Sequence, residues 1–167
     1  RKIMPDLTNA GFRVIAPDMR GYGLTSGGAK NYNSDISEYR LMSLSTDILS
    51  FLSSLEINTI DLLVGHDAGS SVAGVSAMIR PDIFRSVVMM SAPYTGAPDI
   101  KTDLFIEDPI HHNLENLPTP KKHYQWYYST PEANNDMHLE QKELHKFLRA
   151  YYHMKSADWV DNNPYEL

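Results

Sequence analysis

The residues with the clearest capacity for chemistry are five consecutive positions, 65–69, which read Gly-His-Asp-Ala-Gly. A reactive side chain between two such glycines, after an apolar strand and before a helix, is typical of a nucleophile elbow. The backbone two positions before and after the nucleophile nearly touches itself in this turn, so small residues are expected at both positions, and Gly65 and Gly69 meet that demand. Asp67 is then the candidate nucleophile. The alternative is an ordinary Asp that caps the following helix beside two turn glycines.

A carboxylate nucleophile favours one kind of reaction. It attacks amides poorly but displaces a leaving group at a saturated carbon, which gives an alkyl ester of the protein. Water then attacks the carbonyl carbon of that ester, and backbone N–H groups stabilise the oxyanion that forms. The N–H of Ala68, directly after Asp67, is one expected donor.

The elements that must position Asp67 follow from the hydrophobic pattern. Residues 60–64 form an apolar run, which predicts a strand buried on both faces, and small apolar residues at 68–79 predict a helix packed on a sheet. The other expected elements are the end of a helix at 4–10 closed by Gly11, strands at 12–16 and 84–90, a polar loop at 20–37, and an amphipathic helix at 38–55. Strands alternating with helices indicate a parallel sheet.

The order and spacing of these segments resemble the α/β-hydrolase fold, and specifically its epoxide hydrolase branch. The resemblance rests on the run F-R-V-I-A-P-D-M-R-G-Y-G at 12–23, the motif at 65–69 and the strand at 86–90. It implies a partial α/β-hydrolase core over residues 1–93, with a partial parallel sheet and flanking helices. A partial helical cap, or lid, subdomain is expected over residues 94–167. The implied activity is opening of a neutral epoxide, a small-molecule substrate, to a diol without a cofactor.

The same resemblance implies roles for two cap residues. In the family, two cap tyrosines support the departing epoxide oxygen, and the segment H-Y-Q-W-Y-Y at 123–128 resembles the first of them. Tyr124 is therefore the expected hydrogen-bond donor, with Tyr127 and Tyr128 as alternatives. Trp126 is expected to line the substrate pocket, and its alternative role is lid packing. The family's His-Gly-x-Pro segment, acidic partner, water-activating His and second tyrosine are not found in residues 1–167, so we expect a central fragment that is inactive alone.

Other functions remain as alternatives. A dehalogenase would use the same Asp nucleophile, but haloalkane dehalogenases commonly place Trp directly after it, and haloacetate dehalogenases place Arg there and three residues later. Ala68 and Ser71 occupy those two positions here. A non-catalytic binding protein on the same fold is a third hypothesis. An ordinary esterase using Ser70 or Ser71 is disfavoured, because both residues are expected inside the helix that follows the elbow.

The remaining features argue against several classes. A net charge of −6 disfavours nucleic-acid binding, and the absence of Cys excludes disulfides and thiolate metal sites. No apolar run approaches the roughly 18 residues of a membrane span, and a cytoplasmic location is the default expectation. His66 is expected to be structural, and no metal site is expected. Asp108, His111 and His112 are interpreted as part of a polar cap loop. His138, His145 and His153 are interpreted as surface residues of a helical stretch at 138–155.

Overall fold

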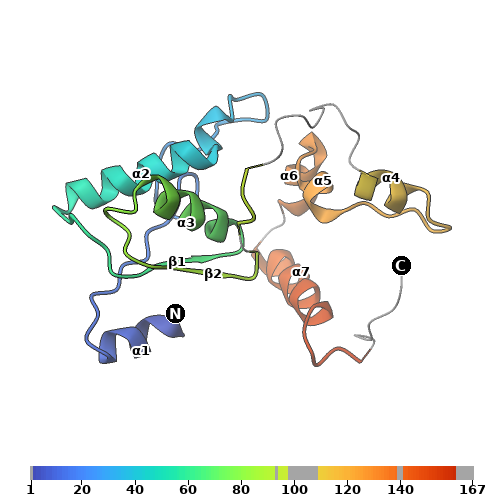
Figure 1. Ribbon diagram of the computed structural model, residues 1–167. Coiled ribbons are helices and arrows are strands. Elements are labelled where there is room, and N and C mark those ends of the chain that lie inside the picture. The colour runs from blue at the N-terminus through green and yellow to red at the C-terminus, as the bar shows by residue number, and fades with distance from the viewer. Residues whose placement is uncertain (1, 93, 98–108, 139–140, 161–167) are drawn as a thin grey trace. The chain divides into compact units, whose positions relative to one another are not determined.

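The computed structural model describes residues 2–92, 94–97, 109–138 and 141–160. Contacts divide the chain into two compact units, Arg1–Ala97 and Pro98–Leu167 (Figure 1). Each unit has its own local architecture. Among the described residues, no helix is long and apolar enough to cross a membrane.

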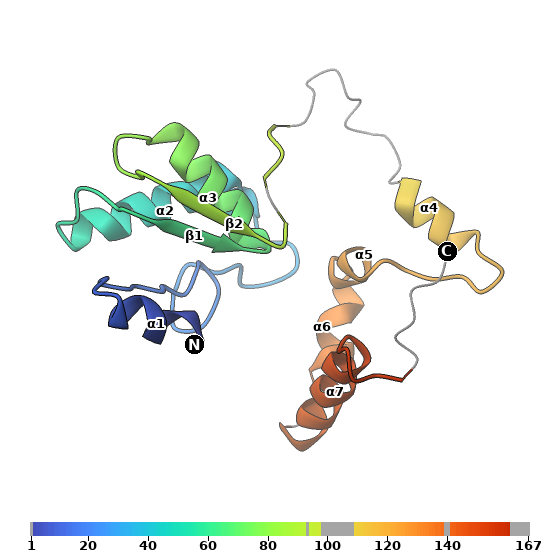
Figure 2. The same ribbon diagram turned by 60° about the horizontal axis from the view of Figure 1, so that its bottom comes forward.

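The first unit contains a parallel βαβ arrangement. Strand β1 (Leu63–His66) leads into helix α3 (Ala68–Ile79), which returns the chain to strand β2 (Val87–Met90). The two strands are parallel, with Leu63 opposite Val87 and His66 opposite Met90. Helix α3 contacts both strands, and helix α2 (Leu41–Ser54) packs on α3, so both helices lie on one face of the sheet (Figures 1 and 2). The predicted α/β class with a partial parallel sheet is confirmed.

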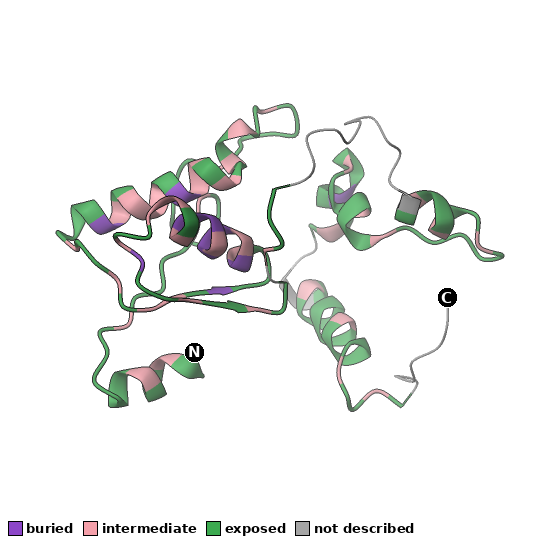
Figure 3. Cartoon of the chain, viewed as in Figure 1, coloured by how far each residue is buried: buried purple, intermediate pink, exposed green. Residues whose placement is uncertain are grey.

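The core of this unit lies between α3, α2 and the sheet (Figure 3). Small side chains on α3 let it approach α2 closely, and at their contact the hydroxyl of Ser76 donates to that of Ser45 at 3.0 Å. Both serines are fully buried, so each hydroxyl satisfies the other in a place that water does not reach. The buried apolar residues of the unit are Leu52, Val72, Ala73, Val75 and Phe84.

Helix α1 (Ile3–Asn9) ends one residue before the expected end at residue 10, and Gly11 closes it as the sequence predicts. The N–H of Gly11 donates to the carbonyl of Thr8, and the N–H of Phe12 donates to the carbonyl of Leu7. These two bonds form a Schellman motif, which requires a left-handed residue after the helix. Gly11 supplies it with a φ of 92°.

All three strand predictions need correction. Residues 12–16 form no strand, because a strand exists only where a neighbour completes its ladder, and the described residues offer this segment none. The strand expected at 60–64 begins at Leu63 and runs through His66. The strand expected at 84–90 begins at Val87, and Phe84 makes only an isolated bridge with Ile60. The ladder thus continues directly into the turn that holds Asp67.

The expectation that the strand is buried on both faces is also wrong. Val64 and its register partner Val88 are each 41% exposed. Their neighbours Gly65 and Met89 face α3. Because successive side chains of a strand alternate between its faces, Val64 and Val88 lie on the face away from α3. No described element packs closely over them, so this apolar face lies open within the first unit.

The polar loop before α2 is fastened to that helix by one arginine. The Arg20 guanidinium donates from Nε and Nη2 to the two carboxylate oxygens of Asp47, at 2.9 and 2.6 Å. Its third nitrogen, Nη1, donates to Glu38 at 2.8 Å, in the short 3₁₀ helix η1 (Ser37–Tyr39). A planar guanidinium suits this two-pronged contact, whereas a lysine ammonium can reach only one carboxylate oxygen well.

Replacing Arg20 with Lys is therefore expected to lower the melting temperature by several degrees although the charge is kept. The matched control is Lys146→Met, which breaks a more exposed pair with Glu143 on a helix of the second unit and is expected to change little. Thermal unfolding followed by circular dichroism measures both. Equal melting temperatures for Arg20→Lys and the unsubstituted chain would contradict this account of the loop.

The regular elements described in the second unit are helices joined by turns and loops. It contains α4 (Pro109–Glu115), α5 (Tyr124–Tyr128), α6 (Pro131–Met137) and α7 (Gln141–Met154). Helix α5 contacts α6, and Ala133 of α6 is the buried apolar residue in this part of the chain. His138 follows α6 rather than lying in the helix with His145 and His153, which corrects the helical stretch expected at 138–155.

Candidate active site

Asp67 occupies the tip of the turn between β1 and α3. Its backbone has φ 55° and ψ −124°, a conformation that residues other than Gly rarely adopt. The turn is held by the N–H of Asp67, which donates to the Met90 carbonyl at 3.0 Å, and by the N–H of Ser70, which donates to the Asp67 carbonyl at 2.9 Å. The side chain is exposed. A strained, exposed carboxylate at a strand end is the geometry of a presented nucleophile.

The two glycines of the motif prove to be unequal. A Cβ added to Gly65 would stand 2.3 Å from the carbonyl oxygen of Gly69, closer than any real contact. A Cβ added to Gly69 would meet nothing within 4 Å. The backbones do approach each other as the motif predicts, but only the Gly65 side lacks room for a Cβ, so the demand for a small residue is strict at Gly65 and looser at Gly69.

The Asp67 carboxylate already contacts the predicted oxyanion donor. The N–H of Ala68 donates to Asp67 Oδ1 at 2.7 Å. An Asp that caps a helix makes the same kind of bond, although capping usually reaches the second or third N–H of the helix rather than the first. In an alkyl ester of Asp67, this N–H would face the carbonyl oxygen, on which negative charge develops during hydrolysis.

Ser70 is placed where it cannot act as a nucleophile. It is fully buried, and its Oγ lies 3.0 Å from the Gly65 carbonyl and 2.7 Å from the Met90 carbonyl. The same Oγ accepts the N–H of Met90 at 3.1 Å. This hydroxyl therefore ties the ends of both strands to the first turn of α3. Ser71 is half-buried one residue further along that helix.

A second polar pair lies at the same edge of the sheet, and sequence reasoning missed one of its members. His66 Nε2 and Ser91 Oγ are hydrogen-bonded at 3.0 Å, and both side chains are exposed. Ser91 directly follows β2 and has a φ of 68°. The signal available in the sequence was its place at the carboxyl end of a parallel strand, where α/β proteins gather their functional groups.

The tyrosines of α5 differ in how their hydroxyls are used. Tyr127 donates to the carboxylate of Asp136 at 2.5 Å, and Tyr128 donates to the hydroxyl of Tyr151 at 3.4 Å. These bonds hold the phenolic protons and raise the pKa of both Tyr127 and Tyr128. Tyr124 is 46% exposed, and its hydroxyl bonds to no other residue in the described ranges. Of the three tyrosines, Tyr124 is therefore the one whose hydroxyl is not engaged by another described residue, and its role as a donor to substrate stays a prediction.

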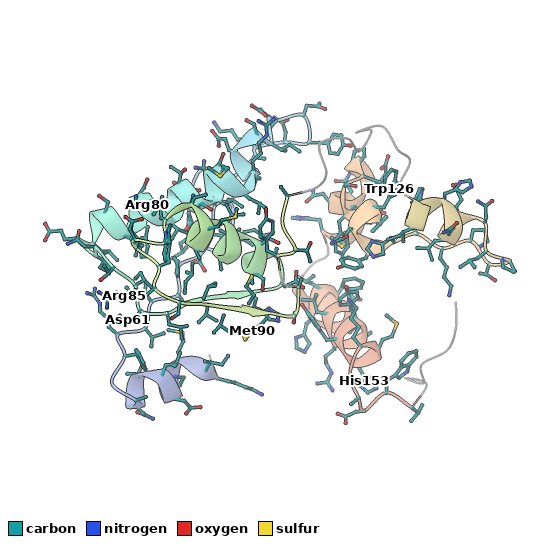
Figure 4. The ribbon with its side chains drawn as sticks, viewed as in Figure 1. Asp61, Arg80, Arg85, Met90, Trp126 and His153 are labelled. Atoms are coloured by element: carbon teal, nitrogen blue, oxygen red, sulfur yellow. The ribbon has the colours of Figure 1, made fainter. Side chains whose placement is uncertain are left out.

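Trp126 is also partly exposed, and one face of its ring is covered. The ring stacks on His111 of α4 with centroids 4.3 Å apart and planes 15° from parallel. The Nδ1 of His111 is buried and lacks a hydrogen-bond partner among the described residues. Trp126, labelled in Figure 4, is 45% exposed, and its role in lining a substrate pocket stays a prediction.

Lys155 contacts two of these tyrosines, Tyr151 and Tyr124. Its Nζ donates to the Tyr151 hydroxyl at 2.7 Å and lies 5.2 Å from the centre of the Tyr124 ring. The hydrogen bond from Lys155 is the main cause that lowers the pKa of Tyr151, and the bond from Tyr128 adds to it. A lowered pKa means that the fold favours tyrosinate. The resulting stabilisation is present above the ordinary Tyr pKa of about 10 and is lost as the pH falls through the lowered value.

Replacing Lys155 with Met is accordingly expected to raise the pKa of Tyr151. An ultraviolet titration of the tyrosinate band measures this, with a Tyr151→Phe variant used to assign the band. The control is Lys146→Met on α7, which removes a lysine whose ammonium pairs with Glu143 instead. An unchanged titration in Lys155→Met would show that the contact does not tune Tyr151.

The described residues contain no group of three or more His, Cys, Asp or Glu side chains placed to hold a metal ion. Asp108, one of the residues considered for such a site, lies outside the described ranges. His112 accepts a bond from Asn116 through its backbone carbonyl at 2.8 Å.

The structure thus brings Asp67 and Ala68 together at the β1–α3 turn and places Tyr124 and Trp126 on α5 of the other unit. The pairing of Asp67 with Tyr124 across a substrate stays a prediction. Figure 4 marks the two ends of the sheet: Met90 lies at the end that carries Asp67, and Asp61 and Arg85 lie at the opposite end.

A strand-to-helix turn of this geometry on a parallel sheet defines a class of protein, and comparison of the sequence agrees. A model for the α/β-hydrolase fold matches residues 1–163, and the chain belongs to this family. Within the family, the chain is 40% identical over 94 residues to an epoxide hydrolase from Caballeronia sordidicola, covering 56% of this chain and 27% of that protein. It is 30% identical over 152 residues to bifunctional epoxide hydrolase 2 from Sus scrofa, covering 89% of this chain and 24% of that protein.

A solved structure agrees with these relatives. An epoxide hydrolase from an endophytic Streptomyces superposes with a TM-score of 0.54 at 25% identity, covering 81% of this chain and 35% of that one. The resemblance to the epoxide hydrolase branch, first seen in the sequence motifs, is confirmed. The chain spans about a quarter of the length of the two relatives named above.

Proposed function

We propose that this chain carries the nucleophile of an epoxide hydrolase, with Asp67 attacking a neutral epoxide to form a covalent ester. The observation that carries the proposal is the backbone of Asp67. Its positive φ and its exposed side chain present a carboxylate at the end of a parallel strand, with Oδ1 already held by the Ala68 N–H at 2.7 Å. The epoxide hydrolase relatives support the same reaction class.

The first step is a displacement at carbon. The free oxygen of Asp67, Oδ2, forms a bond to one epoxide carbon while the bond from that carbon to the epoxide oxygen breaks. The departing oxygen takes the proton of the Tyr124 hydroxyl, which is the role of a general acid. The product is a β-hydroxyalkyl ester of Asp67, and Tyr124 is left as tyrosinate until it is reprotonated.

The second step releases the diol. Water attacks the carbonyl carbon of the ester, and the negative charge that develops on Oδ1 is stabilised by the Ala68 N–H. A general base must take the proton of this water, and an acidic residue must hold that base. We assign neither role to a residue of this chain, so full turnover is expected only from the protein at its natural length.

The experiment that tests the proposal traps the ester. The protein at its natural length is mixed with styrene oxide, quenched in acid within one turnover and analysed by mass spectrometry. We expect a mass increase of one epoxide on the peptide that contains Asp67, and diol among the products. Release of halide from a matched haloalkane, without diol from the epoxide, would favour a dehalogenase. Absence of any adduct would contradict the proposal and favour the hypothesis of a non-catalytic binding protein.

A further inference from the structure

A second strained residue lies beside Asp67, at the end of the neighbouring strand. Asp67 follows β1 with a φ of 55°, and Ser91 follows β2 with a φ of 68°. Because β1 and β2 are parallel and His66 lies opposite Met90, the two residues leave the sheet side by side at the same edge. The labelled Met90 marks this edge in Figure 4. Strained residues other than Gly persist only where their surroundings hold them in place.

The conformation of Ser91 is a tight turn of its own. The N–H of Ala92 donates to the carbonyl of Met90 at 2.9 Å, which closes a three-residue turn around Ser91. With a positive φ at its centre, this is the rarer and more strained form of the γ-turn. Glycine would adopt the same φ without a steric cost. The serine hydroxyl therefore comes with a conformational cost that a glycine would avoid.

The hydroxyl of Ser91 is used in a bond that spans the two strand ends. His66 Nε2 and Ser91 Oγ are 3.0 Å apart, and they join the residue before Asp67 to the residue after Met90. The Met90 carbonyl also accepts the N–H of Asp67 at 3.0 Å. Both bonds hold the peptide plane between His66 and Asp67, and a shift of this plane would change the direction in which the Asp67 side chain leaves the backbone.

We propose that His66 and Ser91 are a positioning pair that sets the direction of the Asp67 carboxylate for attack on the epoxide. This inference rests on the proposed function. Neither residue touches the reacting atoms, and both act through the turn between them. A nucleophile displaced by about 1 Å loses on the order of 10²-fold in rate, so an exposed side-chain bond beside the turn can have a large effect on the chemical step.

A Ser–His pair at hydrogen-bond distance also resembles an activated nucleophile. That role needs a third group that orients the imidazole, and no described side chain hydrogen-bonds to Nδ1 of His66. The strained γ-turn and the bond to the residue before Asp67 instead favour a positioning role. Covalent modification of Ser91 by the epoxide is therefore one of the results that would overturn the proposal.

The test separates rate from stability with the variant Ser91→Gly, which removes the hydroxyl and relieves the positive φ. We expect its melting temperature to be unchanged or higher. The single-turnover rate of ester formation on Asp67 is expected to fall about 10- to 100-fold, while the concentration of styrene oxide that gives half the maximal rate changes less than about threefold. His66→Phe should lose a similar factor, and His66→Gln should recover much of it because its amide can still bond to Ser91.

The double variant His66→Phe with Ser91→Gly should be no slower than either single variant, because both remove the same bond. The matched control is Ser86→Ala. The Ser86 hydroxyl donates to the Asp61 carbonyl and joins the same two strands at their opposite ends, so we expect its loss to leave the rate of ester formation unchanged. All variants are made in the protein at its natural length.

Each result has one meaning. If the unsubstituted protein forms no ester, the proposed function fails before the positioning pair is tested. If the unsubstituted protein forms the ester and Ser91→Gly forms it equally fast, the positioning pair is wrong and the proposed function stands. If Ser91→Gly and Ser86→Ala lose the same factor in rate, the His66–Ser91 bond only supports the sheet in general and the positioning role is wrong. An ester found on Ser91 would also overturn the positioning role.

Discussion

Replacing Asp67 with Asn abolishes formation of the covalent ester, with an expected loss of at least about 10⁴-fold in its rate, the scale seen when a catalytic residue is removed. The amide has no negative charge with which to displace a leaving group at carbon. Asn tolerates a positive φ nearly as well as Asp does, and its side-chain oxygen can still accept the Ala68 N–H. The turn should therefore keep its shape while it loses its reactivity.

The measurement is a rapid-quench mass analysis of the protein at its natural length with styrene oxide, accompanied by thermal unfolding. A matched control is Asp61→Asn, which changes an exposed carboxylate 3.7 Å from Arg85 at the opposite end of the sheet. We expect this control to keep its full rate of ester formation and to shift stability by about 0.5 kcal/mol or less. Ester formation at an undiminished rate in Asp67→Asn would show that another residue attacks the epoxide.

The elbow was predictable from sequence because its requirements are local. A strained turn between a strand and a helix needs an absent side chain at Gly65 and a functional one at Asp67, and both are visible in five consecutive letters. Helix α3 follows at the predicted bounds because its run of small apolar residues has no competing interpretation. The contact between the Ala68 N–H and the Asp67 carboxylate follows from the same turn, whereas the role of this N–H in stabilising an oxyanion stays a prediction.

Properties that depend on distant parts of the chain were not predictable in this way. The apolar run at 12–16 has strand-like residues, but a strand also requires a neighbouring ladder, which no local pattern reports. The role of Ser91 depends on the register that sets His66 opposite Met90, residues 24 positions apart in the chain. The difference between Gly65 and Gly69 in the space for a Cβ depends on the direction of the Gly69 carbonyl, which sequence spacing does not fix.

Replacing Gly65 with Ala is expected to be among the most destabilising single changes in the first unit. The new Cβ would stand 2.3 Å from the Gly69 carbonyl oxygen and 2.7 Å from the Cα of Ser70. Both are backbone atoms, so no side-chain rotation relieves the clash, and β1 and α3 must move apart. Overpacking of this kind costs about 3 kcal/mol or more. Urea unfolding of the variant measures the loss.

The contrasting change, Gly69→Ala, should have the opposite sign although the motif treats the two glycines alike. Its Cβ would meet nothing within 4 Å, and Gly69 lies inside α3 without a positive φ. Alanine is the better helix former, and a gain of about 0.5 to 1 kcal/mol is expected. Since Ser70 anchors both strand ends to the same turn of α3, separation of β1 from α3 in Gly65→Ala should also displace Asp67 and lower the rate of ester formation. Gly69→Ala should keep that rate, and a similar loss of stability in both variants would contradict the one-sided contact on which this prediction rests.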